Sequence, residues 1–116
     1  MILKGLRTIV YHVNDLEQAK TWYAEAFGIK PYFDEPFYVG FDINGSELGL
    51  DPSGEFYSQG NHSITYWKTD DIDNAFEQFN MKGIEIHEEI HNVGGEIRVG
   101  SIADPFGNVI GLIEGA

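Results

Sequence analysis

The feature of this sequence that most constrains its fold is an internal repeat. Asp15 and Gly28 lie thirteen positions apart at the two ends of a predicted helix, and Asp70 and Gly83 lie the same distance apart in the second half. The offset between the halves is therefore 55 positions. Self-similarity at a fixed offset is typical of a duplicated supersecondary unit. The sequence therefore predicts two copies of one unit.

The flanking strands extend this repeat. The same offset aligns Tyr11 with Tyr66. Later in each half, the stretch GSELGLD lies over GNVIGLI, so that Gly49 corresponds to Gly111. A glycine inside a strand usually marks a bulge or a close approach by a ligand or another part of the chain. The two glycines therefore predict that a ligand or another part of the chain closely approaches the last strand of each half, or that this strand has a bulge.

The first half is predicted to form one strand, one helix and three further strands. β-Branched and aromatic residues at 6–13 favour a strand, and apolar residues at helical spacing favour a helix over 15–27. The Asn44-Gly45 pair predicts a tight hairpin between the last two strands. These three later strands are expected at 30–34, 37–43 and 46–51.

The second half repeats this order. Residues 62–68 favour a strand, and an apolar stripe that begins at Ile72 favours a helix ending near Gly83. Three β-like segments follow at 84–90, 96–102 and 108–114. The chain is therefore predicted to be of the α+β class, with tandem βαβββ repeats over about residues 1–55 and 60–116.

Composition limits the class of protein. The apolar content of 42% and eight Phe suit a single domain over residues 1–116. No apolar stretch is long enough to span a membrane and no leader precedes the first strand, so we expect a cytoplasmic protein that binds no membrane. The absence of cysteine excludes thiolate sites. A net charge of −12 with seven Lys and Arg argues against nucleic-acid binding.

Two motifs make the repeat recognisable. The stretch VNDLEQAKTWYAEAFGIKP after the first strand and DPFGN before the last strand resemble the vicinal-oxygen-chelate superfamily, which includes glyoxalase lyases, bleomycin-resistance proteins, fosfomycin-resistance transferases and extradiol dioxygenases. The resemblance implies an open, cup-shaped mixed sheet with the helices outside. It also implies a homodimer, in which the cups are completed by strand swapping or side-by-side contact.

The resemblance also implies where a metal would bind, because metal-dependent members use one ligand from each of four strands. In the first strand the usual His is replaced by Thr8, and in the fifth strand the position falls on Ser63 or Ile64. The last strand has Gly111 in place of the usual Glu, and the fourth has Gly49. Hydroxyl, hydrocarbon and glycine are poor ligands for zinc, iron or nickel.

A displaced metal site is the alternative. Glu47 lies two residues before Gly49 on the same strand face, and His62 lies next to the predicted ligand position of the fifth strand. With His12 as a third ligand they could hold a divalent metal such as Zn, Ni, Fe or Mn. A zinc or iron site needs at least three good ligands in reach. At the positions that the resemblance implies, at most Glu47 and His62 could contribute, each only after a shift in register, so we predict that the protein has no cofactor.

The expected function follows from this loss. We expect the glycines to leave floor space in the cup for a small organic molecule, in a sequestering or sensing role. Alternatives are a glyoxalase-type lyase with the displaced metal site and a non-catalytic interaction module. The sequence leaves open whether the protein is an enzyme, and whether it serves resistance or metabolism. The predicted ligand-binding residues are Thr8, Val10, His12, Gly49, Ile64, Tyr66 and Gly111.

Two further motifs have competing interpretations. The stretch HEEIH, from His87 to His91, satisfies the H-E-x-x-H pattern of zinc peptidases, a remote alternative that requires a helix. We predict a strand there, on which the two histidines would lie about 13 Å apart, too far to share one zinc. Arg98, one of two arginines, could bind an anionic ligand group or form a surface salt bridge.

Overall fold

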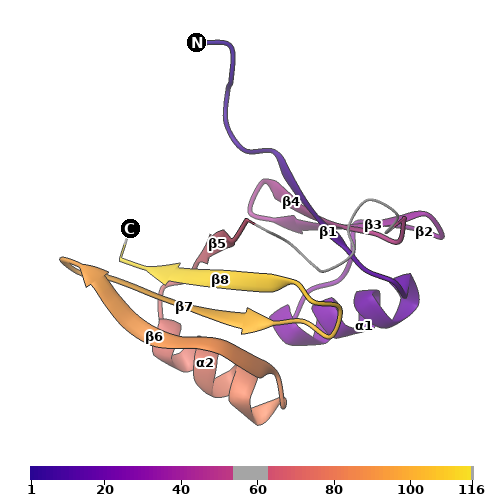
Figure 1. Ribbon diagram of the computed structural model, residues 1–116. Coiled ribbons are helices and arrows are strands. Elements are labelled where there is room, and N and C mark those ends of the chain that lie inside the picture. The colour runs from indigo at the N-terminus through magenta and orange to yellow at the C-terminus, as the bar shows by residue number, and fades with distance from the viewer. Residues whose placement is uncertain (54–62, 116) are drawn as a thin grey trace. The chain divides into compact units, whose positions relative to one another are not determined.

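The computed structural model describes residues 1–53 and 63–115 (Figure 1). The chain divides into two compact units, Met1–Gly60 and Asn61–Ala116. We call the described parts of these units the first module and the second module. Of the helices that the structure describes, neither is long and apolar enough to cross a membrane.

The first module is a four-stranded open sheet with one helix. Strand order is β1-β4-β3-β2, with β1 and β4 parallel and the other neighbours antiparallel. The predicted hairpin is present, because Asn44 and Gly45 both have positive φ between β3 and β4. The elements are β1 (Thr8–His12), α1 (Leu16–Phe27), β2 (Phe33–Glu35), β3 (Tyr38–Ile43) and β4 (Ser46–Asp51).

The second module has the same plan, with strand order β5-β8-β7-β6 and one parallel pair, β5 with β8. The two βαβββ modules with open mixed sheets confirm the predicted α+β fold. Its elements are β5 (Thr65–Lys68), α2 (Ile72–Met81), β6 (Glu85–Gly94), β7 (Ile97–Ala103) and β8 (Val109–Glu114). Strand β5 is shorter than predicted, and His62 lies outside the described residues.

Both helices begin and end for reasons visible in the sequence. Asp15 caps α1 by accepting a hydrogen bond from the backbone N–H of Gln18 at 3.1 Å, and Gly28 ends it in the left-handed conformation. Asp71 caps α2 by accepting from the backbone N–H of Asn74, also at 3.1 Å. The cap of the second helix is therefore Asp71 and not Asp70, which the repeat offset had aligned with Asp15.

This one-residue difference corrects the alignment of the first strands. In the parallel pairs, Val10 lies opposite Gly49 and Tyr66 lies opposite Gly111. Tyr66 is therefore the counterpart of Val10, and its predicted match with Tyr11 is wrong. Since adjacent residues of a strand face opposite sides, Tyr66 shares the face of Val10, as its prediction as a ligand-binding residue requires, and not that of Tyr11.

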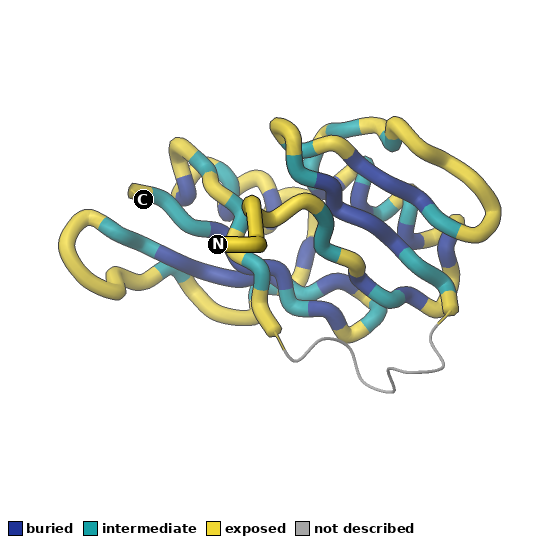
Figure 2. Tube along the Cα trace, turned by 90° about the horizontal axis from the view of Figure 1, so that it is seen from above, coloured by how far each residue is buried: buried dark blue, intermediate teal, exposed yellow. Residues whose placement is uncertain are grey.

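In each module the helix packs against one face of its own sheet, and the buried apolar residues lie between that helix and that sheet. Figure 2 shows the buried residues concentrated along the strands. In the first module the ring of Tyr11 stacks on Tyr23 of α1, with centroids 6.0 Å apart, and Phe41 and Leu48 are fully buried. Burial of such side chains from water is the main stabilising contribution to a small domain. We call the opposite side of each sheet, which bears Val10 in the first module and Tyr66 in the second, its open face.

Candidate functional site

The open face of the first module holds a buried carboxylate, Glu47 on β4, of which 9% is exposed. It accepts hydrogen bonds from the hydroxyls of Thr8 and Tyr38, each at 3.0 Å, and from the hydroxyl of Tyr32. The Nη1 atom of Arg7 lies 3.4 Å from Oε1 of the same carboxylate. These five residues form what we call the Glu47 network. Burial of a charge is tolerated when it is paired in this way.

The sheet itself brings these groups together. Thr8 lies directly opposite Glu47 in the parallel pair of β1 and β4, so both side chains emerge on the open face. Gly40 of β3 makes room for them, because a Cβ atom there would lie 2.5 Å from Oε2 of Glu47 and 3.1 Å from the Tyr32 ring. The backbone N–H of Tyr32 donates to the Gly40 carbonyl at 2.9 Å and fixes the ring nearby.

Hydrogen bonding decides the protonation of this network. Burial, the largest influence, acts to raise the pKa of Glu47, but the hydrogen bonds from Tyr32, Thr8 and Tyr38 and the charge of Arg7 together lower it below its ordinary value. Burial and the bond to Glu47 raise the pKa of Tyr38 to about 12. The bond to Glu47 also raises the pKa of Tyr32. At neutral pH the carboxylate is therefore ionised and both phenols remain protonated.

A pocket of about 310 Å³ opens beside this network, at the end of the sheet next to the hairpin that joins β3 and β4. A pocket of this size lies at the lower end of the range for small-molecule sites. It is lined by Arg7, Tyr32, Asp42, Gly45, Ser46 and Glu47.

The space above the two strand glycines is filled. A Cβ atom at Gly49 would lie 1.9 Å from the hydroxyl oxygen of Tyr38, and one at Gly111 would lie 2.5 Å from Cδ1 of Tyr66. The expectation that these glycines leave vacant floor space is therefore wrong. Each glycine instead allows a tyrosine of its own sheet to lie flat on the open face, which is the close approach that a strand glycine permits.

The other predicted ligand-binding residues lie on the open faces. Thr8, Val10 and His12 alternate along β1, and the structure joins Thr8 to Glu47 by a hydrogen bond. Tyr66 occupies the open face of the second module, and Ile64 lies just before β5, with both side chains partly exposed. A ligand contact at any of these positions stays a prediction.

The donor set does not fit a divalent metal. Within residues 1–53 and 63–115, no group of three or more His, Asp or Glu side chains could hold one. Both carboxylate oxygens of Glu47 already accept hydroxyl hydrogen bonds, and the hydroxyl of Thr8 is used in one of them. His62, the other ligand of the predicted alternative, lies outside the described residues.

The HEEIH motif lies on β6, as predicted, and not on a helix. His91 is paired with Val99 of β7, and its Nδ1 atom lies 2.9 Å from the carbonyl oxygen of Glu89. On a strand, the ligand geometry of a zinc peptidase cannot form because His87 and His91 lie too far apart. The peptidase interpretation is therefore wrong.

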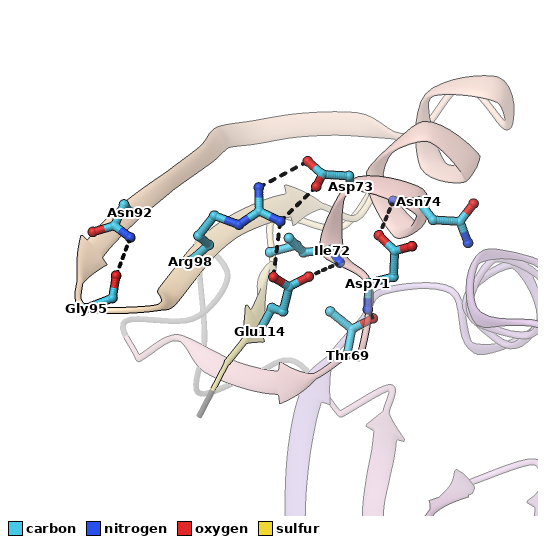
Figure 3. Close-up of polar contacts among 9 residues, drawn as sticks. All are labelled: Thr69, Asp71, Ile72, Asp73, Asn74, Asn92, Gly95, Arg98 and Glu114. Carbon is cyan, nitrogen blue, oxygen red and sulfur yellow. Dashed lines mark hydrogen bonds and ion pairs between the residues drawn. The ribbon is translucent and has the colours of Figure 1, made fainter.

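Arg98 lies on the helix side of the second module and binds carboxylates of its own chain (Figure 3). Its Nη1 and Nη2 atoms contact the two oxygens of Asp73 at 3.2 and 2.7 Å, and Nη2 also contacts Oε2 of Glu114 at 3.1 Å. The other oxygen of Glu114 accepts the backbone N–H of Ile72 at 2.8 Å. The salt-bridge interpretation is thus confirmed, and we call these contacts the Arg98 clasp.

Of the six residues that line the pocket, sequence reasoning identified only Glu47 as a site residue. The five that it missed include Arg7, Tyr32 and Asp42. Arg7 and Tyr32 fall within the predicted strands 6–13 and 30–34, but neither was assigned to a face, and in the structure they lie just before β1 and β2. The one available signal was that Arg7 lies beside Thr8 and that few cations occur in this acidic chain.

Comparisons with known proteins agree with this geometry. Residues 5–112 match the sequence model of the Glyoxalase/Bleomycin resistance protein/Dioxygenase superfamily. No curated protein matches the chain significantly.

Several solved structures share the fold. A lactoylglutathione lyase from Agrobacterium tumefaciens aligns with a TM-score of 0.82 and 19% identity, over 99% of this chain and 96% of that one. A superfamily member from Sphaerobacter thermophilus aligns with a TM-score of 0.81 and 20% identity, over 99% and 100% of the two chains. A glyoxalase-related enzyme from Fulvimarina pelagi aligns with a TM-score of 0.81 and 18% identity, over 97% of this chain and 89% of that one. At such identities these similarities show the fold alone.

Proposed function

The chain belongs to the Glyoxalase/Bleomycin resistance protein/Dioxygenase superfamily, and we propose that it binds a small organic molecule at the Glu47 pocket of its first module, without a catalytic metal. The role that follows is sequestration or sensing. We include in this proposal that residues 1–116 act as one domain, in a homodimer and in the cytoplasm.

The observation that carries the proposal is that the second module folds without such a network. The paired registers place the two open faces in correspondence, with Gly49 equivalent to Gly111. A fold that forms with hydrocarbon at these positions does not require a buried ionised carboxylate there. The counterparts of Thr8, Glu47 and Tyr38 in the second module are Ile64, Val109 and Val99.

The surroundings of the network suit a ligand with an apolar body and a polar end. The ring of Phe33 lies 6.1 Å from those of Phe37 and Tyr38, and the side chain of Phe37 is exposed. Exposed aromatic surface of this kind provides affinity, whereas a few polar groups in the pocket set the orientation of the ligand.

A fragment screen tests the proposal. In ¹H–¹⁵N correlation spectra we expect binding fragments to shift the amide signals of residues 45–47, and we expect Glu47→Gln to abolish most of these shifts. Glu77→Gln, an exposed substitution on α2, is the matched control and should leave them unchanged. Fragment shifts that survive Glu47→Gln would contradict the assignment of the pocket.

Metal analysis separates this proposal from a glyoxalase-type lyase. Protein purified without a histidine tag should contain no stoichiometric zinc, nickel, iron or manganese. Stoichiometric metal that is lost on Glu47→Gln would show that Glu47 is a ligand of a displaced metal site, and would replace the proposed function by that of a metal-dependent enzyme.

A further inference from the structure

The charges around the pocket are unequal. Two carboxylates, Glu47 and Asp42, line it, and Arg7 is the one cation among its lining residues. The lining therefore carries a formal charge of −1 when the carboxylates are ionised. Because the whole chain is also strongly acidic, with a net charge of −12, the surrounding field attracts cations and repels anions.

The neutral groups of the pocket add to this preference. The hydroxyl of Tyr32 donates its only proton to Glu47, so its remaining lone pairs are acceptors. Tyr32 also lines the pocket and is 59% exposed, so a face of its ring is available to a bound group. A pocket of two carboxylates, one phenol oxygen and an aromatic face suits a ligand that donates hydrogen bonds and carries positive charge.

Arg7 reaches the network only with the tip of its side chain, which is 80% exposed. Its Nη1 atom donates to the Thr8 hydroxyl oxygen at 2.7 Å and lies 3.4 Å from Oε1 of Glu47, the long end of the hydrogen-bond range. Because the Arg7 partner is largely in solvent, a single long contact of this kind contributes little to stability. A competing cation could therefore displace the guanidinium into solvent without disturbing the core of the module.

We propose that the Glu47 pocket selects ligands with a primary ammonium or amidinium group, which takes the position beside Glu47 and Asp42 that Arg7 partly fills. This inference rests on the proposed function and adds the chemical class of the ligand to it. The cation lies against the exposed ring of Tyr32 and donates to the carboxylates.

Three probes with the same ring test the inference: benzylamine, which is cationic at neutral pH, benzyl alcohol and benzoate. Each is titrated at low ionic strength to millimolar concentration while the amide signals of residues 45–47 are followed. We expect benzylamine to bind about tenfold more tightly than benzyl alcohol, the size of one charge-assisted hydrogen bond, and benzoate to cause no shift.

Two variants show which groups set this preference. Glu47→Gln should bring benzylamine and benzyl alcohol to nearly equal affinity. Arg7→Gln, at an exposed position where folding is not in question, should raise the affinity for benzylamine several-fold because it removes the competing cation.

The outcomes distinguish the two proposals. Equal affinity for benzyl alcohol and benzylamine in the unmodified protein, or weaker benzylamine binding in Arg7→Gln, would overturn the cation preference and leave the pocket as a binding site. If none of the three probes shifts these signals, both the cation preference and the proposed function fail.

Discussion

The two modules share strand order, helix position and a glycine under a tyrosine, but their open faces differ. In the first module Glu47 is surrounded by hydroxyls and Arg7, whereas the second module has aliphatic side chains at the equivalent positions. Since one chain builds the same sheet with and without such a network, the βαβββ plan can form without one. The comparison teaches that the open face of the first module is the specialised one.

On the helix sides of the sheets, the second module is the one with the additional contacts. In the second module the Arg98 clasp ties β7 and β8 to the start of α2, and Phe76 of α2 reaches the sheet at Gly100. In the first module Val39, fully buried, occupies the position equivalent to Gly100. The polar and close-packed contacts that distinguish the second module therefore hold its helix to its sheet. Those that distinguish the first module, the Glu47 network, lie beside its pocket.

The largest effect on stability is expected when Gly100 is replaced by valine, the residue at the equivalent position of the first module. A Cβ atom there would lie 2.7 Å from Cζ of the buried Phe76 ring and 3.2 Å from the carbonyl oxygen of Glu88. We expect Gly100→Val to lower the free energy of unfolding by about 3 kcal/mol, measured by urea denaturation, because neither neighbour can move freely.

Phe76→Leu provides the control for this substitution. If the ring is the obstacle, adding Phe76→Leu to Gly100→Val should recover part of the lost stability, although Phe76→Leu alone is destabilising. An unchanged urea midpoint for Gly100→Val would mean that α2 does not approach the sheet as closely as described.

A smaller loss is expected when the Arg98 clasp is removed. Arg98→Ala leaves Asp73 and Glu114 without their shared cation and should lower the melting temperature by a few degrees at neutral pH. Lys20→Ala is the matched control in the first module, because Lys20 also pairs with two carboxylates, Glu17 and Asp34. The control should shift the melting temperature less, since Lys20 links α1 only to the edge strand β2 and forms no two-atom pair like that of Arg98 with Asp73. Equal shifts would remove the distinction between the modules.

The same clasp should give a defined pH dependence. The bond to Arg98 lowers the pKa of Asp73, and the backbone N–H of Ile72 followed by Arg98 lowers that of Glu114. Carboxyls with a lowered pKa stabilise the folded state above their ordinary pKa and lose this contribution as the pH falls through the lowered value. The difference in melting temperature between wild type and Arg98→Ala should therefore shrink as the pH falls below about 4. A difference that grows in acid would contradict the clasp.

The helix caps should behave alike in the two modules. Asp15→Ala and Asp71→Ala each remove one side-chain acceptor from a helix start, so each should lower the free energy of unfolding by about 1 kcal/mol. The Asn variants should retain most of the stability, because Asn also caps helices. If Asp70→Ala proves more damaging than Asp71→Ala, the corrected alignment of the modules is wrong.

Much of the fold could be predicted because its signals are local. Asp15 and Gly28 identified the ends of α1, and the Asn44-Gly45 pair identified the hairpin. The repeat offset was wrong by one at β5, because two consecutive aspartates precede α2 and only the hydrogen bond to Asn74 shows which of them caps it. A one-residue error matters in a strand because it exchanges the faces.

The site was less predictable because it depends on contacts between strands. The sequence identified Thr8, Glu47 and Gly49, but as separate positions in a metal site. That Tyr38 of β3 would lie over Gly49 depends on the register of two strands and the rotamer of the side chain. Tyr32 reaches Glu47 from outside any strand. No local pattern encodes such contacts.

The smallest change in stability is expected from a triple variant that combines Thr8→Ile, Glu47→Val and Tyr38→Phe. This variant tests most directly whether the Glu47 network serves binding or folding. It gives the first module the residues of the second at two positions and keeps the ring that covers Gly49. If the network serves binding, urea denaturation should give a free energy of unfolding within about 1 kcal/mol of wild type. The reason is that Thr8, Glu47 and Tyr38 become apolar together, while the exposed side chains of Tyr32 and Arg7 can bond water instead. A loss as large as that expected for Gly100→Val would show that the network holds the fold together.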